Sequence, residues 1–349
     1  MNDSSRPTVL IASYLEPEHV ERIRAVDPRL DIVYEPSLLR RPRYAADHTG
    51  APGPRSPEDE ARWRALLARA DVLFDFDYTN EKELPELCPR VRWIQATSAG
   101  IGPFVKRRGY ETRMPGTVFT TASGVHARPL AEFCALAMLA FSRGLFTMLE
   151  AQRQKHWARF AGTDLLGKTV VIYGHGSIGE EVARVARSFG MRTIGIKRSV
   201  QGLDPEALQV DELHPAAGLH AVLPRADFLV LAAPHTPETE GAVGRPELAL
   251  LPRGAVLINV GRGALVDEKA LVDALRSGRL GGAALDVFQE EPLPEQSPLW
   301  TMPNVLVSPH SASTSDRENA RLTDLFCRNL LRFLAGEPLE NVLDTDRLY

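Results

Sequence analysis

The sequence predicts an α/β protein with two Rossmann-like, doubly wound parallel-sheet domains. Its 349 residues are enough for two hydrophobic cores, because a domain commonly holds about 100 to 200 residues. Short apolar runs alternate with helical stretches, most regularly from residue 169 onward, and this alternation is typical of parallel sheets. One of these runs also enters a glycine-rich turn that opens a helix.

The N-terminal part is expected to be a small α/β unit. Its predicted strands are 9–12, 71–74, 93–96 and 118–121. Residues 40–58 carry four prolines and two glycines, so a loop is expected there. A helix predicted at 129–143 is apolar on most sides and should be buried against a neighbouring domain or a partner subunit. Residues 150–165 are a mixed polar segment that fits an arm.

The second half predicts a larger parallel sheet. Its strands are expected at 169–173, 192–196, 227–232, 255–260, 283–287 and 304–308. Helical segments lie between most of them, and a final helix is expected at about 315–335.

Composition and charge exclude several classes of protein. The apolar content of 44% and charged content of 25% are ordinary for a globular protein, and a net charge of −4 argues against nucleic-acid binding. Three separate cysteines indicate neither a disulfide framework nor a metal site. No apolar stretch approaches the ~20 residues that a membrane span needs, and the start lacks a signal-peptide core. We therefore expect no metal, no membrane and a cytoplasmic location.

A glycine-rich turn predicts a dinucleotide site. The strand 169–173 runs into Gly174-His-Gly-Ser-Ile-Gly179, and a helix at 180–189 follows at once. The glycines allow a tight turn and close approach of a pyrophosphate, which the helix N-terminus stabilises. A structural turn is the alternative, but the strand–turn–helix context favours a nucleotide site. His175 is interpreted as a solvated loop histidine. The expected cofactor ligands here are Gly174, Gly176, Ser177, Ile178 and Gly179.

The end of the next strand predicts which cofactor binds. NAD sites usually place an acid there to bind the ribose 2′-hydroxyl, whereas this strand ends in Lys197-Arg198-Ser199. Two cations and a hydroxyl suit a 2′-phosphate. NADP(H) is therefore the expected cofactor and NAD(H) the possible alternative. The competing interpretation is that Lys197 and Arg198 are exposed strand-end charges.

Three residues near the ends of late strands predict the chemistry. Arg262, Glu291 and His310 each come shortly after an apolar run, and ligands of parallel sheets bind beyond the carboxyl ends of strands. Imidazole titrates near neutral pH, a carboxylate can orient it, and a guanidinium binds a carboxylate or keto oxygen. Each residue alone has a structural explanation. Together, beside a dinucleotide turn, they predict carbonyl reduction with His310 as the proton donor.

The chain resembles the D-isomer-specific 2-hydroxyacid dehydrogenase family over nearly its whole length. The matching stretches are 99–101, 166–169, 174–179, 234–239, 258–267, 284–292 and 308–310. The resemblance implies a nucleotide domain inserted into the substrate domain. The expected boundaries are 1–125 for the first part of the substrate-binding domain, 126–311 for the NAD(P)-binding Rossmann domain and 312–349 for the return to the substrate-binding domain.

The resemblance also implies roles for individual residues. Arg262 would bind and polarise the substrate, Glu291 would tune His310, and His310 would be the acid–base. Backbone N–H groups of Ser98, Ala99, Gly100 and Ile101 would hold the substrate carboxylate. Asp286 would contact the nicotinamide carboxamide, and Pro234, Thr239 and Val260 would line the cofactor cleft. Gly102 departs from the family, since many members carry Asp there.

Within the family, the Lys-Arg-Ser strand end resembles NADPH-preferring glyoxylate/hydroxypyruvate reductases. The expected substrate is a small 2-keto or 2-hydroxy acid, and the expected assembly is a homodimer through the nucleotide domain. An NAD-dependent D-lactate- or phosphoglycerate-type dehydrogenase is one alternative. A non-catalytic dinucleotide-sensing binding protein on the same scaffold is another.

Overall fold

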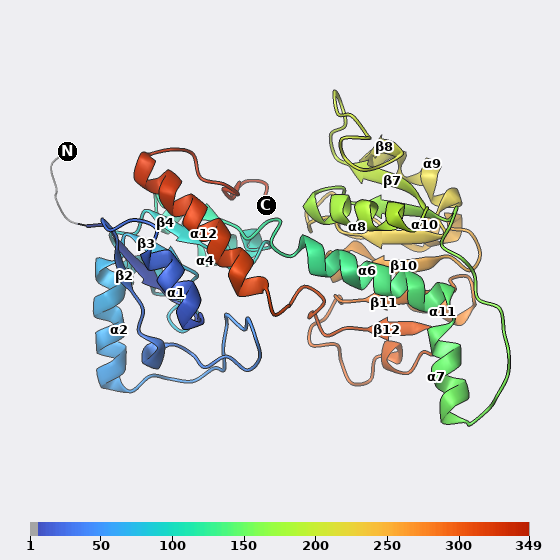
Figure 1. The fold of residues 1–349 in the computed structure, drawn as a ribbon, viewed down its shortest axis with the longest axis horizontal. Helices are drawn as coiled ribbons and strands as arrows, with labels where there is room; N and C mark the ends of the chain where they lie inside the picture. Colours follow the sequence, from blue (N-terminus) through green and yellow to red (C-terminus); the bar gives the residue numbers. More distant parts are fainter. Residues whose placement is uncertain (1–5, 349) are drawn as a thin grey trace. The chain divides into compact units, whose positions relative to one another are not determined.

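The computed structural model describes residues 6–348, which divide into two compact units. Unit 1 contains the chain up to Val125 and from Thr314 onward, and unit 2 contains His126–Ser313. Each unit has one parallel sheet with helices on both of its faces (Figure 1). The predicted α/β class with two parallel sheets is therefore confirmed.

Unit 1 is built on a five-stranded sheet in the order β2-β1-β3-β4-β5. Its strands are β1 (Thr8–Ile11), β2 (Asp31–Val33), β3 (Val72–Phe74), β4 (Trp93–Gln95) and β5 (Val118–Thr120). The predicted strands are confirmed, except that β2 was not predicted. This three-residue edge strand is only half-buried and lacks a strong apolar pattern.

Helices cover both faces of this sheet. The helices α1 (Pro17–Arg24) and α12 (Glu318–Ala335) pack on one face, where Phe326 of α12 meets Trp93 of β4. The other face is covered by α2 (Pro57–Arg69), α3 (Leu84–Leu87), α4 (Gly102–Arg108) and α5 (Tyr110–Arg113). A 3₁₀ turn at Pro36–Leu38 is followed by residues 39–56 without helix or strand. The loop predicted at 40–58 is therefore present but ends two residues earlier, because Pro57 is the first residue of α2.

Unit 2 is built on a seven-stranded sheet in the order β12-β11-β10-β9-β6-β7-β8. Its strands are β6 (Thr169–Tyr173), β7 (Arg192–Lys197), β8 (Glu212–Pro215), β9 (Phe228–Leu231), β10 (Val256–Asn259), β11 (Gly282–Leu285) and β12 (Val305–Val307). All six predicted strands are present. The order reverses between β6 and β9, so the turn after β6 lies at the switch point where parallel sheets bind ligands. The unpredicted β8 is a half-buried edge strand of sequence Glu-Leu-His-Pro.

Two layers of helices sandwich this sheet. The helices α6 (Ala127–Ser142) and α8 (Ser177–Ser188) lie side by side over one face (Figure 1). The other face is covered by α9 (Leu219–Val222), α10 (Arg245–Leu250) and α11 (Glu268–Arg276). Short 3₁₀ turns occur at Ala216–Gly218, Leu223–Arg225, Gly263–Leu265 and Pro298–Trp300.

The apolar helix α6 is followed by α7 (Leu145–Arg153) and then by residues 154–164 without regular structure. One side of α6 is buried in the core of unit 2, but Leu136 and Leu139 are exposed in the single chain. Among residues 6–348, no single helix is long and apolar enough to cross a membrane. The bent pair α6–α7 meets that test by length and composition only.

Candidate active site

The glycine turn between β6 and α8 leaves room for a pyrophosphate. Gly174 has a φ of 99°, and a side chain there would overlap the backbone of Ala233. Gly179 lies against the carbonyl of Gly174. At Gly176, in contrast, an added Cβ would meet no atom within 4 Å. Two glycines therefore close the turn while the third leaves space at the start of α8, where Ser177 and Ile178 form the first turn. These residues fit a dinucleotide phosphate.

The interpretation of His175 as solvated is wrong. The residue is only 1% exposed, because the loop after β7 covers it: the Nε2–H of His175 donates to the carbonyl oxygen of Leu208 at 2.8 Å. The ring also packs against Gly179 and Gly195, where a Cβ would crowd it. Burial lowers the pKa of His175, so the ring is neutral and structural rather than a ligand for phosphate.

The two cations at the end of β7 differ in their surroundings. The Nζ of Lys197 donates to the carbonyl oxygen of His175 at 2.8 Å, so this ammonium ties the strand end to the glycine turn. Arg198 lies near Glu238: the pKa of Glu238 is lowered first by a hydrogen bond from Thr236 and further by the charge of Arg198. Ser199 follows in the same exposed loop. The acid Glu238 was not anticipated from the sequence.

The segment 234–239 closes on itself beside this region. The Oγ1 of Thr239 donates to the carbonyl oxygen of Pro234 at 2.7 Å and accepts from the backbone N–H of Thr236 at 2.8 Å. These bonds fix a compact turn after β9. Pro234 and Thr239 therefore act together as one structural element.

A short turn after β10 presents Arg262. The side-chain Nδ2 of the buried Asn259 donates to the carbonyl oxygen of Arg262 at 3.0 Å, and its Oδ1 accepts from the N–H of Gly261 at 3.1 Å. Val260 is tied to β9 through Leu231. A side chain at Gly263 would overlap the backbone of Phe288, so the turn lies directly against the loop that carries Glu291. This close approach explains the glycine after Arg262.

The Arg262 guanidinium is poorly solvated. Burial lowers the pKa of Arg262, and the negative charge of the Glu291 carboxylate opposes this shift. The only hydrogen bond recorded for the side chain within residues 6–348 goes to the carbonyl oxygen of Gly261, at 2.7 Å. A half-buried guanidinium that uses only one of its donors in the described part of the chain is well suited to bind an anion or a polarised carbonyl.

His310 and Glu291 form a direct pair. The Nδ1 of His310 lies 2.8 Å from the Oε2 of Glu291, and the Oε1 of Glu291 accepts from the N–H of Phe288 at 3.0 Å. Glu291 is thus fixed at one oxygen and orients the imidazole with the other. The Nε2 of His310 has no recorded partner within residues 6–348, so it is the nitrogen that can exchange a proton with a ligand.

Asp286 holds the His310 loop. Its Oδ1 accepts from the Oγ of Ser308 at 2.6 Å and from the N–H groups of Ser311 and Ala312 at 2.8 and 2.9 Å. Its carbonyl oxygen also accepts from the N–H of His310 at 2.9 Å. His310 has a φ of 53°, an uncommon conformation for a non-glycine residue, and this set of bonds compensates for it. The sequence did not reveal this structural role.

Unit 2 therefore brings Arg262, Glu291 and His310 together around the ends of β10, β11 and β12. The arrangement can bind an anion or keto oxygen at Arg262 and deliver a proton from His310. No group of three or more His, Cys, Asp or Glu side chains within residues 6–348 has metal-binding geometry.

The predicted substrate loop lies in unit 1, after β4. The Oγ of Ser98 accepts from the N–H of Gly100 at 3.3 Å, which shapes the loop, and Ala99 and Ile101 flank that glycine. A side chain at Gly102 would overlap the backbone of Leu348, near the end of the chain. This contact gives a physical reason why aspartate is absent there.

The neighbouring strand end carries a buried acid, Asp75. It is fully buried, has a φ of 68°, and accepts from the Oγ1 of Thr97 at 2.9 Å and the hydroxyl of Tyr78 at 3.2 Å. Thr97 directly precedes the substrate loop. Burial raises the pKa of Asp75 to about 6, although its hydrogen bonds oppose the shift.

We expect Asp75→Asn to stabilise the protein at neutral pH. A raised pKa means that the stabilising contribution of protonated Asp75 is complete below about pH 4 and is lost as the pH rises through about 6. Asparagine stays neutral and tolerates positive φ. The gain above pH 6 should therefore reach up to about 3 kcal/mol. Urea unfolding at pH 4 and pH 7.5 measures this effect. A difference between variant and wild type that is the same at both pH values would contradict it.

The family model for the NAD-binding domain of the D-isomer specific 2-hydroxyacid dehydrogenases matches residues 135–312. These residues include the glycine turn, Arg262, Glu291 and His310. The chain belongs to the D-isomer-specific 2-hydroxyacid dehydrogenase family. It is therefore an NAD(P)-dependent oxidoreductase that acts on the CH–OH group of 2-hydroxy acids.

Three relatives illustrate the range of this dehydrogenase family. The chain is 36% identical to a glyoxylate reductase of Thermococcus kodakarensis over 272 residues, which cover 74% of this chain and 78% of the relative. It is 34% identical to a D-3-phosphoglycerate dehydrogenase of Methanocaldococcus jannaschii over 231 residues, 66% of this chain but only 43% of that protein. The crystal structure of an NADPH-dependent glyoxylate/hydroxypyruvate reductase from Sinorhizobium meliloti, in complex with NADP and sulfate, superposes with a TM-score of 0.76 at 27% identity. That alignment covers 98% of this chain and all of the other.

Proposed function

We propose that this dehydrogenase is an NADP(H)-preferring reductase of small 2-keto acids, of the glyoxylate/hydroxypyruvate type. The observation that carries the proposal is the His310–Glu291 pair at 2.8 Å, with the half-buried Arg262 guanidinium under the influence of the same carboxylate. A general acid and a guanidinium are the groups that reduction of a keto acid requires. The glyoxylate reductases among the relatives support the substrate class.

Each residue of the site has a separate role in the proposed reaction. A bound nicotinamide supplies the hydride that adds to the keto carbon. Arg262 binds the substrate and stabilises the negative charge that develops on the keto oxygen. His310 gives the proton on its Nε2 to that oxygen, which becomes the hydroxyl, while Glu291 keeps the Nδ1–H oriented and stabilises the charged ring. The N–H groups of the loop at Ser98 hold the substrate carboxylate in this proposal.

The preference for NADP(H) rests on the end of β7. This strand ends in Lys197 and continues into Arg198 and Ser199, with no carboxylate at its end, and this cationic end suits a 2′-phosphate. Binding of NADP by the relative from Sinorhizobium meliloti supports it.

The test is a matrix of initial rates with NADPH and NADH against glyoxylate, hydroxypyruvate, pyruvate, phenylpyruvate and 2-ketoisocaproate. We expect the highest kcat/KM with NADPH and one of the two smallest polar substrates. In Arg198→Asp, kcat/KM for NADPH should fall while that for NADH stays the same or rises. Equal loss with both cofactors would refute the role of Arg198. Binding of NADPH without turnover of any substrate would favour a dinucleotide sensor, and faster NADH use would favour a lactate- or phosphoglycerate-type enzyme.

We further propose a homodimer through unit 2, in the cytoplasm. Leu136 and Leu139 of α6 and Met148 and Leu149 of α7 are all exposed in the single chain, and Trp157 in the segment that follows is 95% exposed. Apolar side chains gathered on adjacent helices are typical of a subunit interface. We expect a dimer in sedimentation equilibrium and a monomer for Leu136→Glu. A wild-type monomer would exclude this interface.

A further inference from the structure

A cavity of about 390 Å³ lies in unit 1, between the proline-rich segment and the first turn of α2. Its size falls within the range of about 300–1,000 Å³ that is usual for small-molecule sites. Three arginines, Arg40, Arg41 and Arg55, contribute to the lining, against a single acid, Asp59. None of the predicted catalytic or cofactor residues belongs to it.

The segment that forms the cavity is held by its own polar core. The buried carboxylate of Asp47 accepts from the backbone and side chain of Arg43, from Thr49 and from the N–H of Gly50. Gly50 has a φ of 61° and lies against Arg40, so that a side chain there would crowd the Arg40 Cβ. Arg40 is therefore fixed at its backbone by the fold of the segment.

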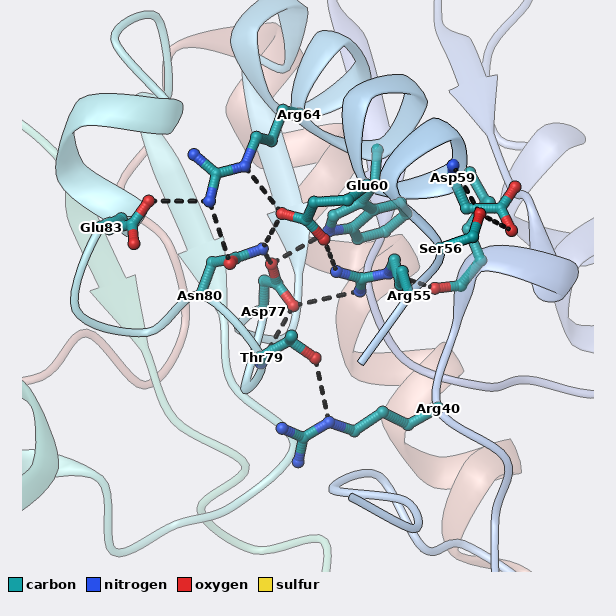
Figure 2. A network of polar contacts seen from close by, with 12 residues as sticks. Arg40, Arg55, Ser56, Asp59, Glu60, Arg64, Asp77, Thr79, Asn80 and Glu83 are labelled. Carbon is teal, nitrogen blue, oxygen red and sulfur yellow. Dashed lines mark hydrogen bonds and ion pairs between the residues drawn. The ribbon is translucent and has the colours of Figure 1, made fainter. Parts of the chain in front are cut away.

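The charge of Arg55 is already balanced. Its guanidinium pairs with Glu60 at 3.1 Å and Asp77 at 3.3 Å (Figure 2). It also lies 4.7 Å from the ring centroid of Trp63. The same two acids also accept from Arg64 and Asn80. This network joins α2 to the loop after β3 and leaves no net positive charge to bind a ligand.

The charge of Arg40 is not balanced in this way. Its three hydrogen bonds go to neutral acceptors: the Oγ1 of Thr79 at 3.0 Å and the carbonyl oxygens of Tyr78 at 2.9 Å and Thr49 at 3.4 Å. Figure 2 shows it at the edge of the network, joined through Thr79. Within residues 6–348, no carboxylate lies within 4 Å of it. Within the same residues, the exposed side chain of neighbouring Arg41 has neither an ion pair nor a hydrogen bond. Two guanidinium charges without a paired carboxylate therefore border one cavity.

We infer that this cavity binds a small molecule that carries two or more negative charges, such as a polycarboxylate or a phosphorylated metabolite. Arg40 and Arg41 bind the anion, because planar guanidinium forks match carboxylate and phosphate oxygens. No aromatic ring among residues 6–348 lines the cavity, so this part of the chain offers a nucleobase no stacking surface there. The N-terminus of α2 borders the cavity but does not attract the anion, because Ser56 caps the helix and three acids occupy its first turn.

The test is calorimetric titration of the full-length protein, saturated with NADP⁺, with citrate and with inorganic pyrophosphate. We expect one site per chain for at least one of the two probes, which also distinguishes a polycarboxylate from a phosphate ligand. Acetate, which carries one charge, should bind much more weakly. Arg40→Gln and Arg41→Gln should each weaken binding by roughly tenfold, the effect of one charge-assisted hydrogen bond.

Two variants serve as controls. Arg107→Gln removes the same charge from an exposed arginine of α4 outside the cavity and should leave binding unchanged. Arg262→Gln should also bind normally, which separates this site from the catalytic guanidinium. The inference is overturned if neither probe binds, if Arg107→Gln weakens binding as much as Arg41→Gln, or if only Arg262→Gln abolishes it. None of these results depends on turnover, so they test the cavity separately from the proposed function.

Discussion

Replacing His310 by alanine is expected to lower kcat for 2-keto acid reduction by about 10²- to 10⁴-fold, the usual contribution of a general acid. The Nδ1 of His310 is committed to Glu291 at 2.8 Å, so the Nε2 is the nitrogen left to donate a proton. Alanine offers no substitute donor. Steady-state rates with saturating NADPH measure the loss, and a fluorescence titration of NADPH should show unchanged binding.

The same unit provides a matched control. His220 of α9 pairs with Glu247 at 2.7 Å, a histidine–glutamate contact as short as that of His310, but it belongs to a helix and does not follow a strand end. His220→Ala removes a histidine–glutamate contact of nearly the same length and should leave kcat unchanged. Equal losses in the two variants would show that the effect of His310→Ala is structural. Full activity of His310→Ala would refute the proton-transfer role.

Local sequence was sufficient for the features that short segments determine. The strand β6, the glycine turn and the start of α8 follow from the run between Thr169 and Gly179, in which an apolar strand leads through three closely spaced glycines directly into a helix. The placement of Arg262, Glu291 and His310 after β10, β11 and β12 also followed from the sequence, because each comes shortly after an apolar run. The edge strands β2 and β8 were missed because half-buried strands of three and four residues carry little apolar pattern.

Features that depend on distant contacts could not be predicted. His175 is buried because Leu208, 33 residues later, covers it, and nothing in the glycine turn signals that loop. Asp286 was expected to contact the nicotinamide. Its observed bonds to the loop at Ser311 arise because β11 and β12 are neighbours. The lack of a carboxylate partner for Arg40 likewise becomes clear only from the structure, where its guanidinium donates to Thr79 and to the carbonyl oxygen of Tyr78 in the loop after β3.

Replacing Arg262 by glutamine is expected to lower kcat/KM for the keto acid by about 10²- to 10³-fold, as for the loss of a donor that stabilises developing charge. Both parameters should change, because the guanidinium binds the substrate and stabilises the oxygen that accepts the hydrogen. Arg262→Lys should recover only part of the rate, since an ammonium keeps the charge but loses the planar fork. Rates measured over a range of glyoxylate and hydroxypyruvate concentrations separate kcat from KM.

The stability of the same variant decides whether Arg262 acts in catalysis or in folding. Burial disfavours the charged form of Arg262, which is why its pKa is lowered, and its one recorded side-chain bond goes to the adjacent Gly261 carbonyl. Removing a poorly solvated charge with so few partners should leave the free energy of unfolding unchanged or raise it. Arg262→Gln should therefore lose activity without a decrease in the urea midpoint. This combination is expected of a residue whose role is to bind a ligand rather than to stabilise the fold. If activity and the urea midpoint fell together, Arg262 would be a structural residue. His310 would then lack the substrate-binding guanidinium that the proposed reaction requires.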